Sequence, residues 1–142
     1  MPTNKNRIPP NDRPLTRSEI MARVRSKNTS PEILIRSSLH KSGLRFRIHR
    51  KDLPGNPDIV FPSRRLAIFV NGCFWHQHTG CKRATIPLTR RDYWEKKLLR
   101  NVERDATNYS ALELAKWRVI VVWECEITAS RVAELITEIR QS

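Results

Sequence analysis

The sequence lacks an apolar stretch long enough to cross a membrane, for which about 18 to 20 consecutive apolar residues are needed. It also lacks an apolar leader, because residues 1–17 are polar, basic and interrupted by prolines. A secretory signal requires an apolar core in that position. We therefore expect neither a membrane span nor secretory export.

Cysteine is scarce, with three residues among 142. An odd number does not suit a disulfide framework, and Cys73 and Cys81 share a short segment with histidine, as soft metal ligands do. Thiols of this kind suit a reducing compartment. We expect a cytoplasmic protein of bacterial type, associated with the nucleoid.

Acidic residues are also few: 14 oppose 27 lysines and arginines, which gives a net charge of +13. The excess of cations is spread over the whole chain, which indicates a polyanionic partner. A chain of 142 residues fits one compact domain. We predict a flexible basic arm over residues 1–17 and a single domain over residues 18–142, without internal repeats.

The pattern of caps and apolar residues predicts a helix over residues 31–42. Thr29 would cap this helix, Glu32 follows three residues later, and Gly43 supplies the stop. Its apolar side comprises Leu34, Ile35 and Leu39.

Three strands are predicted in the middle of the chain. Residues 45–49 alternate between polar and apolar, as in a half-buried strand. Residues 58–61 and 66–70 are apolar β-formers separated by a Pro-Ser-Arg-Arg turn, which indicates a hairpin of central strands. Reflecting the chain about this turn places Asp58 opposite the end of the second strand, so Asp58 should neighbour Asn71.

The second half of the chain predicts a long helix over residues 91–115, an apolar strand over residues 118–123 and a closing amphipathic helix over residues 128–140. A strand, helix and strand in this order favour a right-handed crossover between parallel strands. Parallel neighbours end at the same edge of a sheet. Cys125 should therefore come close to Cys73.

The long helix carries one acidic residue, Asp105, on its apolar stripe. The stripe comprises Leu98, Val102, Tyr109 and Leu112. A carboxylate on the core-facing side of a helix costs free energy unless it is hydrogen-bonded or paired with a cation. Asp105 should therefore have a specific partner, which would be either a histidine or an arginine.

Four side chains form a candidate metal site: Cys73, His78, Cys81 and Cys125. Three thiolates and one imidazole match a closed, tetrahedral structural zinc site, which would anchor a loop too irregular to fold alone. The alternative is three free, buried cysteines. Four protein ligands leave no open position for water, so any hydrolysis must occur elsewhere.

His76 lies in the same segment and is the histidine that we do not assign to zinc, although spacing alone does not rank it against His78. An imidazole that is hydrogen-bonded to a carboxylate such as Asp105 has a fixed tautomer, and its free nitrogen can act as a general base toward water. The alternative is that His76 only caps the loop.

Asp58 follows a Pro-Gly-Asn-Pro turn and begins a core strand. Aspartates beside turns are ordinarily solvated. As a hard oxygen ligand, Asp58 would instead suit Mg²⁺, which keeps most of its waters and needs only one or two carboxylates together with a substrate phosphate.

Large aromatic residues lie among cations in this region. We expect Phe74 and Trp75 to be exposed, because a polar metal loop has little core to offer them. Trp94 begins the long helix after a linker rich in cations and is expected to be exposed as well. Exposed rings among lysines and arginines could enter a base step of DNA and unstack it. The alternative is that they are core residues, as we expect of Trp117 and Trp123.

The chain resembles the very short patch repair endonucleases, the Vsr family, from about residue 18 to residue 126. The resemblance rests on Arg-Ser-Lys-Asn-Thr at 25–29, His-Arg-Lys-Asp-Leu-Pro-Gly at 49–55, Pro-Asp-Ile-Val-Phe-Pro at 57–62, Gly-Cys-Phe-Trp-His at 72–76, Asn-Val-Glu-Arg-Asp at 101–105 and Val-Trp-Glu-Cys at 122–125. The family implies a restriction-endonuclease-like fold, with a mixed central β-sheet flanked by helices. It also implies nicking of one strand of duplex DNA on the 5′ side of a thymine mispaired with guanine, the product of 5-methylcytosine deamination.

The resemblance implies a role for each matching residue. Asp58 looks like the Mg²⁺ ligand, helped by the backbone carbonyl of Val70, and His76 looks like the water-activating base oriented by Asp105. The structural zinc set looks like Cys73, His78, Cys81 and Cys125. The residues pushed into the base stack look like Phe74, Trp75 and Trp94, with Met21 as a helper from the N-terminal segment. Glu32 resembles an acid near the active site, although its capping position explains it equally well.

Two departures from the family pattern bear on the mechanism. Val70 and Asn71 stand where well-studied members have threonine and histidine. A valine still offers its carbonyl to a metal, whereas asparagine cannot donate a proton as imidazolium does, so assistance to the leaving group would fall to a metal-bound water. The loop also has one extra residue between His78 and Cys81.

We therefore expect a monomeric, Mg²⁺-dependent DNA endonuclease with a structural zinc, acting on duplex DNA with a T:G mispair and having mismatch-repair proteins as further partners. Asn71 stays among the candidate catalytic residues because of its position. The sequence leaves three alternatives open: a DNA-binding module that is stabilised by zinc and has no catalytic activity, a zinc-dependent hydrolase of another substrate, and a nuclease that cuts undamaged DNA.

Overall fold

The computed structural model describes residues 30–141. The predicted arm over residues 1–17 and the position of Met21 lie outside this range. The described elements are, in chain order, α2 (Ser30–Lys41), β1 (Arg47–Ile48), β2 (Ile59–Phe61), η1 (Pro62–Arg64), β3 (Leu66–Asn71), η2 (Lys82–Ala84), α3 (Arg91–Leu114), β4 (Arg118–Trp123), η3 (Glu124–Glu126) and α4 (Ala129–Arg140).

One mixed sheet of four strands organises the described part of the chain, in the order β1-β2-β3-β4. The pairs β1–β2 and β2–β3 are antiparallel, and β3–β4 is parallel. The predicted hairpin and the predicted parallel pairing of the strands before and after the long helix are thus both confirmed. The fold is mixed α/β.

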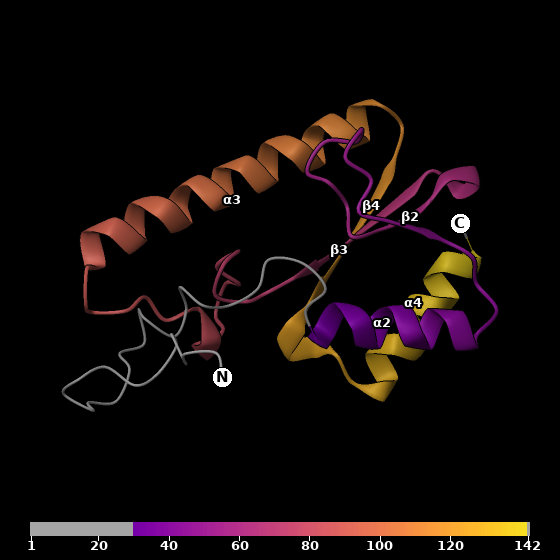
Figure 1. Cartoon of the computed structure of the whole chain (residues 1–142), viewed down its shortest axis with the longest axis horizontal. Helices are drawn as coiled ribbons and strands as arrows, with labels where there is room; N and C mark the ends of the chain where they lie inside the picture. The colour runs from indigo at the N-terminus through magenta and orange to yellow at the C-terminus, as the bar shows by residue number, and fades with distance from the viewer. Residues whose placement is uncertain (1–29, 142) are drawn as a thin grey trace, which may run out of the picture.

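The helices lie on both sides of the sheet, with α2 and α4 side by side below it and the long α3 above it in Figure 1. The core under α2 and α4 includes Ile35, Leu39, Leu135 and Ile139, packed with Ile59, Leu66, Ile68 and Val122 of the strands. On the other side, Leu112 of α3 packs with Ala67 and Phe69 of β3. The strands are apolar on both faces because helices cover both faces.

Local signals explain where the helices begin and end. α2 ends at Lys41, and Gly43 follows with φ of +80°, a left-handed conformation that glycine adopts without a steric cost. The side chain of Thr128 caps α4 by accepting a hydrogen bond from the backbone N–H of Arg131.

Three details of the predicted elements are wrong. Leu34 is 53% exposed and Val102 is 38% exposed, because α2 and α3 each cover the sheet with a narrower stripe than the sequence pattern suggested. The strand predicted over residues 45–49 is reduced to Arg47–Ile48. Its end coincides with His49, whose φ of +50° takes the backbone out of the extended conformation.

No helix within residues 30–141 is both long enough and apolar enough to span a membrane.

Candidate active site and metal centre

The segment after β3 carries most of the candidate site. Its backbone turns back on itself, with the N–H of His76 donating to the carbonyl of Gly72 and the N–H of His78 donating to the carbonyl of Cys73. The side chain of Asn101, on α3, donates to the carbonyl of Trp75 at 3.1 Å. These bonds fix the segment between the end of β3 and the middle of α3.

The four predicted zinc ligands come together at the carboxyl ends of β3 and β4. The ligand atoms of Cys73, His78, Cys81 and Cys125 all lie within 4.8 Å of one another. Nδ1 of His78 is 3.6 Å from Sγ of Cys73 and 3.3 Å from Sγ of Cys125. Sulfur and nitrogen ligands on one tetrahedral zinc ion are about 3.6 Å apart. The donor set and its spacing therefore fit a tetrahedral metal site.

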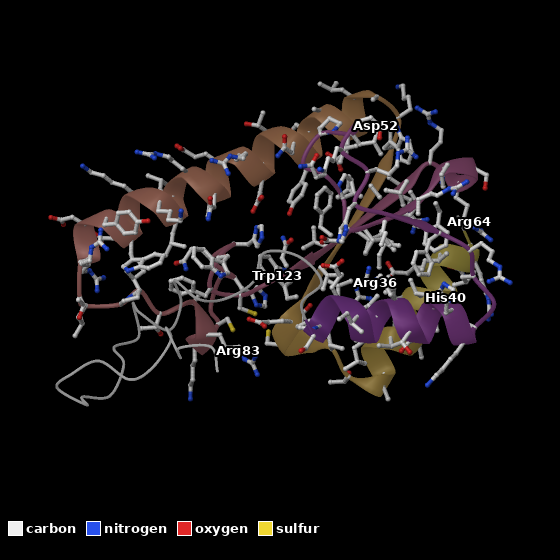
Figure 2. All side chains as sticks on the ribbon, in the orientation of Figure 1. Arg36, His40, Asp52, Arg64, Arg83 and Trp123 are labelled. Carbon is white, nitrogen blue, oxygen red and sulfur yellow. The ribbon has the colours of Figure 1, made fainter. Side chains whose placement is uncertain are left out.

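The surroundings of His78 also suit a metal ligand. Its ring stacks on Trp123 with a centroid separation of 4.2 Å, and its Nε2 lies 3.8 Å from a carboxylate oxygen of Glu126. Figure 2 shows sulfur atoms gathered beside Trp123, at the end of β4. A metal-binding histidine is usually hydrogen-bonded through its second ring nitrogen, and Glu126 at 3.8 Å lies just beyond that distance.

Burial raises the pKa of the Cys73 thiol to about 12, so this side chain is a neutral thiol at neutral pH unless a cation stabilises the thiolate. The convergence of four soft donor atoms from two separate segments is what favours metal binding over three free thiols.

His76 points away from the cysteines and pairs with α3. Its Nδ1 is 2.6 Å from Oδ2 of Asp105. The structure therefore ranks the two histidines that spacing could not rank, and it gives Asp105 the histidine partner in place of the arginine. With an ionised Asp105 accepting from Nδ1–H, the Nε2 of His76 is left as a proton acceptor.

Asp58 lies where the hairpin register predicted, just before the pair Ile59 and Ile68. Its Oδ2 accepts a hydrogen bond of 2.7 Å from the backbone N–H of Val70. Burial raises the pKa of Asp58 to about 6, the negative charge of Glu32 adds to this shift, and the charges of His49 and His76 oppose it. The charged neighbours of Asp58 thus come from α2, from the residue after β1 and from the segment after β3.

Two titratable neighbours of Asp58 come from α2 and from the residue after β1. Glu32 is 2% exposed, and its Oε2 is 2.6 Å from Nε2 of His49. Glu32 was predicted as a candidate, and its carboxylate faces the site. His49 was not predicted. The backbone N–H of His49 donates to the carbonyl of Asp58 at 3.3 Å, a pairing between β1 and β2 that the sequence pattern did not predict.

Asn71, at the end of β3, is buried, and its amide donates a hydrogen bond of 2.8 Å to the hydroxyl of Tyr109. Burial raises the pKa of Tyr109 to about 12, and the charges of Asp105 and Asp58 act in the same direction. Tyr109 therefore stays neutral at neutral pH. It was not predicted as a neighbour of Asn71, because its spacing in the long helix placed it among the core residues. Asn71 holds this tyrosine against the site.

The aromatic residues correct one expectation. Phe74 is 4% exposed and Trp94 is 2% exposed, so both are buried and were wrongly expected to be exposed. They pack with each other and with Leu98 of α3, while Trp75 and Ile86 lie partly buried against them. The segment between β3 and α3 thus has a small core of its own, formed with the first turns of α3. Trp75 is the most accessible ring of this cluster.

Exposed cations are frequent along the loop that follows the cysteine cluster and along α3. They are Lys82, Arg83, Arg90, Arg91, Lys96, Arg100 and Arg104. Exposed lysines and arginines supply salt-sensitive attraction to phosphates without a choice of sequence. These cations therefore suit contact with a nucleic-acid backbone.

Comparison with known proteins agrees with this chemistry. Residues 12–83 match the family model for the DNA mismatch endonuclease Vsr. The chain is 56% identical over 115 residues to the type II nicking enzyme V.XorIIP of Xanthomonas oryzae pv. oryzae, covering 81% of this chain and 84% of the relative. It is 40% identical over 131 residues to the type II nicking enzyme V.NmeAIP of Neisseria meningitidis, covering 89% and 93%.

A further relative carries the family's own name. The chain is 42% identical over 112 residues to the DNA mismatch endonuclease Vsr of Escherichia coli, covering 79% of this chain and 71% of the relative. The buried carboxylate, the histidine and aspartate pair and the cysteine cluster thus lie in a sequence whose relatives are nicking enzymes. The chain belongs to the Vsr family and is a DNA endonuclease, a hydrolase of phosphodiester bonds.

Proposed function

We propose that this endonuclease nicks one strand of duplex DNA on the 5′ side of the thymine in a T:G mispair, and so initiates repair of deaminated 5-methylcytosine. The observation that carries the proposal is the 2.6 Å contact between His76 and Asp105 in a site whose charges act on Asp58. A general base and a carboxylate ligand at one site are what metal-assisted hydrolysis of a phosphodiester requires.

In this mechanism, His76 accepts a proton from the attacking water at Nε2. Asp105 holds the ring through Nδ1 and stabilises the imidazolium that forms. The side chains of His76 and Asp105 are 30% and 22% exposed, so a water molecule can reach the imidazole without disrupting its hydrogen bond to Asp105. Fixing the tautomer in advance is how such pairs lower the barrier to proton transfer.

Asp58, with the backbone carbonyl of Val70, would hold a Mg²⁺ ion. The donor set fits this ion because hard oxygen ligands are what Mg²⁺ prefers, and the raised pKa of Asp58 reflects a carboxylate whose charge a cation would stabilise. When bound, the ion would stabilise negative charge on the phosphate. The metal at the four-ligand cluster would be zinc, and it would hold the aromatic loop rigid.

The aromatic cluster would open the mispair. Trp75 is the accessible ring, and Phe74 packs edge-on against it at 5.2 Å between centroids. We propose that Trp75 enters the base stack first, with Phe74 and Trp94 following as the cluster opens, and that Met21 assists from the N-terminal segment. Unstacking a step costs a few kcal/mol and is easiest at a mispair, which supports selectivity for mismatched DNA.

The strand order, with one parallel pair beside an antiparallel hairpin and helices on both faces, supports a restriction-endonuclease-like fold. We propose a single endonuclease domain over residues 18–142, preceded by a basic arm over residues 1–17 that lies on DNA phosphates, and a monomer as the active form. Mismatch-repair proteins are the partners that this activity would serve.

The test is a gel assay on a labelled duplex with one T:G mispair, beside a fully paired duplex of the same sequence. We expect a nick 5′ of the mispaired thymine that requires Mg²⁺ and is lost in Asp58→Ala. Asp52→Ala, which removes an exposed aspartate of the same turn region, is the matched control and should nick normally. Equal nicking of the paired duplex would point instead to a nuclease of undamaged DNA.

A further inference from the structure

A second pair of carboxylate and imidazole lies beside Asp58 and has no part in activating water. Glu32, near the start of α2, and His49, just after β1, are joined at 2.6 Å between Oε2 and Nε2. Both residues act on the charge of Asp58, as His76 of the first pair does. Two such pairs therefore influence a single carboxylate.

The three side chains have the spacing of metal ligands. One donor atom each from Glu32, His49 and Asp58 lies within 4.8 Å of the other two. Ligands at 2.1 Å from an octahedral ion are about 3 Å apart when adjacent and about 4.2 Å apart when opposite. A cation could be coordinated after shifts of a few tenths of an ångström. Within residues 30–141, this group and the cysteine cluster are the two with such spacing.

Burial and charge both favour a cation here. Glu32 is 2% exposed and lies close to the half-buried carboxylate of Asp58, and two such carboxylates are most stable with positive charge beside them. Arg36 supplies part of that charge at 3.7 Å from Glu32. The backbone N–H of His49 donates to the carbonyl of Asp58, which holds His49 beside that residue.

We propose that His49 is a direct nitrogen ligand of the divalent cation that Asp58 and Glu32 hold, and that it gives this centre a preference for Mn²⁺ over Mg²⁺. The inference rests on the proposed role of Asp58 as the ligand of the catalytic cation. Imidazole nitrogen binds Mn²⁺ and later transition metals more readily than Mg²⁺, which prefers oxygen. His49 would coordinate through Nε2 as the neutral tautomer that carries its proton on Nδ1. Mg²⁺ would bind the same three residues more weakly.

The test is electron spin-echo spectroscopy of Mn²⁺ bound to the full chain with its cysteine site loaded with zinc. A directly coordinated imidazole gives a ¹⁴N modulation, so the readout does not depend on nicking. We expect this modulation in the wild-type protein and its loss in His49→Gln, with Mn²⁺ affinity reduced by about tenfold or more and Mg²⁺ affinity reduced less. His40→Gln, which removes an exposed histidine of α2, is the matched control and should leave the modulation unchanged.

Three results would overturn the inference: bound Mn²⁺ without ¹⁴N modulation, a modulation that survives His49→Gln, or equal losses of Mn²⁺ and Mg²⁺ affinity. The second result would identify another histidine, such as His76, as the ligand. Thermal melting of His49→Gln shows whether the variant is folded, and Glu32→Gln provides a second variant that should also weaken Mn²⁺ binding. Mispair-dependent nicking in Mg²⁺, with any of these results, would leave the proposed function standing.

Discussion

The hydrogen bond between His76 and Asp105 makes a quantitative prediction for Asp105→Asn. Asparagine preserves the size of the side chain but removes the charge that stabilises the imidazolium, and its amide can turn its NH₂ toward Nδ1 and favour the wrong tautomer. A general base contributes about 10² to 10⁴ in rate. Because the base itself remains, we expect nicking to slow by about 10² to 10³, or about 3 to 4 kcal/mol of barrier.

The same substitution should have little effect on folding or on DNA binding. The pair is partly exposed, and such pairs typically contribute less than about 1 kcal/mol to stability. The assay is single-turnover nicking of a T:G duplex at saturating enzyme, with DNA affinity measured separately. Glu103→Gln makes the same charge change at an exposed position of α3 and serves as the matched control. Wild-type nicking by a folded Asp105→Asn protein would refute the role assigned to this pair.

Three further predictions follow from the site. The pKa of Asp58 is raised from 3.8 to about 6, so the folded state favours its protonated form, and wild-type stability relative to Asp58→Asn should fall as pH rises from about 4 to 6. The free energies of unfolding are measured with urea and without added divalent cation. At pH 8 we expect Asp58→Asn to be more stable than the wild type by up to about 3 kcal/mol. A difference between the two proteins that is the same at pH 4 and at pH 8 would contradict the raised pKa of Asp58. Cys81→Ser should reduce the zinc content measured by atomic absorption and lower the melting temperature, whereas full zinc occupancy would exclude Cys81 as a ligand. Trp75→Ala should weaken binding to a mispaired duplex by about 1 to 3 kcal/mol more than to a paired one, and equal losses on both would argue against stacking.

Local sequence signals predicted much of the framework of the site. The turn between β2 and β3 fixed the register that joins Asp58 to Val70, and the crossover through α3 brought Cys125 to Cys73. Asp105 was identified because a carboxylate on an apolar stripe needs a partner. In each case the relevant geometry follows from a short turn or from the rule for parallel strands.

The features that were missed depend on packing between elements. The contact of Glu32 with His49 requires α2 to be placed against β1, and no local pattern specifies that placement. The burial of Phe74 and Trp94 likewise depends on how the metal loop folds onto the start of α3. His76 and His78 could not be distinguished by spacing, because only the turn after Gly72 sends one ring to α3 and the other to the cysteines.

We propose that Asp58 and His76 act on the same phosphate as one catalytic unit. A double-mutant cycle with Asp58→Asn and His76→Gln measures the coupling between them, using single-turnover nicking of a T:G duplex in Mg²⁺ with excess enzyme. Residues that act as a unit are strongly non-additive, so the double variant should be about as slow as the slower single variant. Losses that multiply in the double variant would show that the two side chains act independently and would contradict this account.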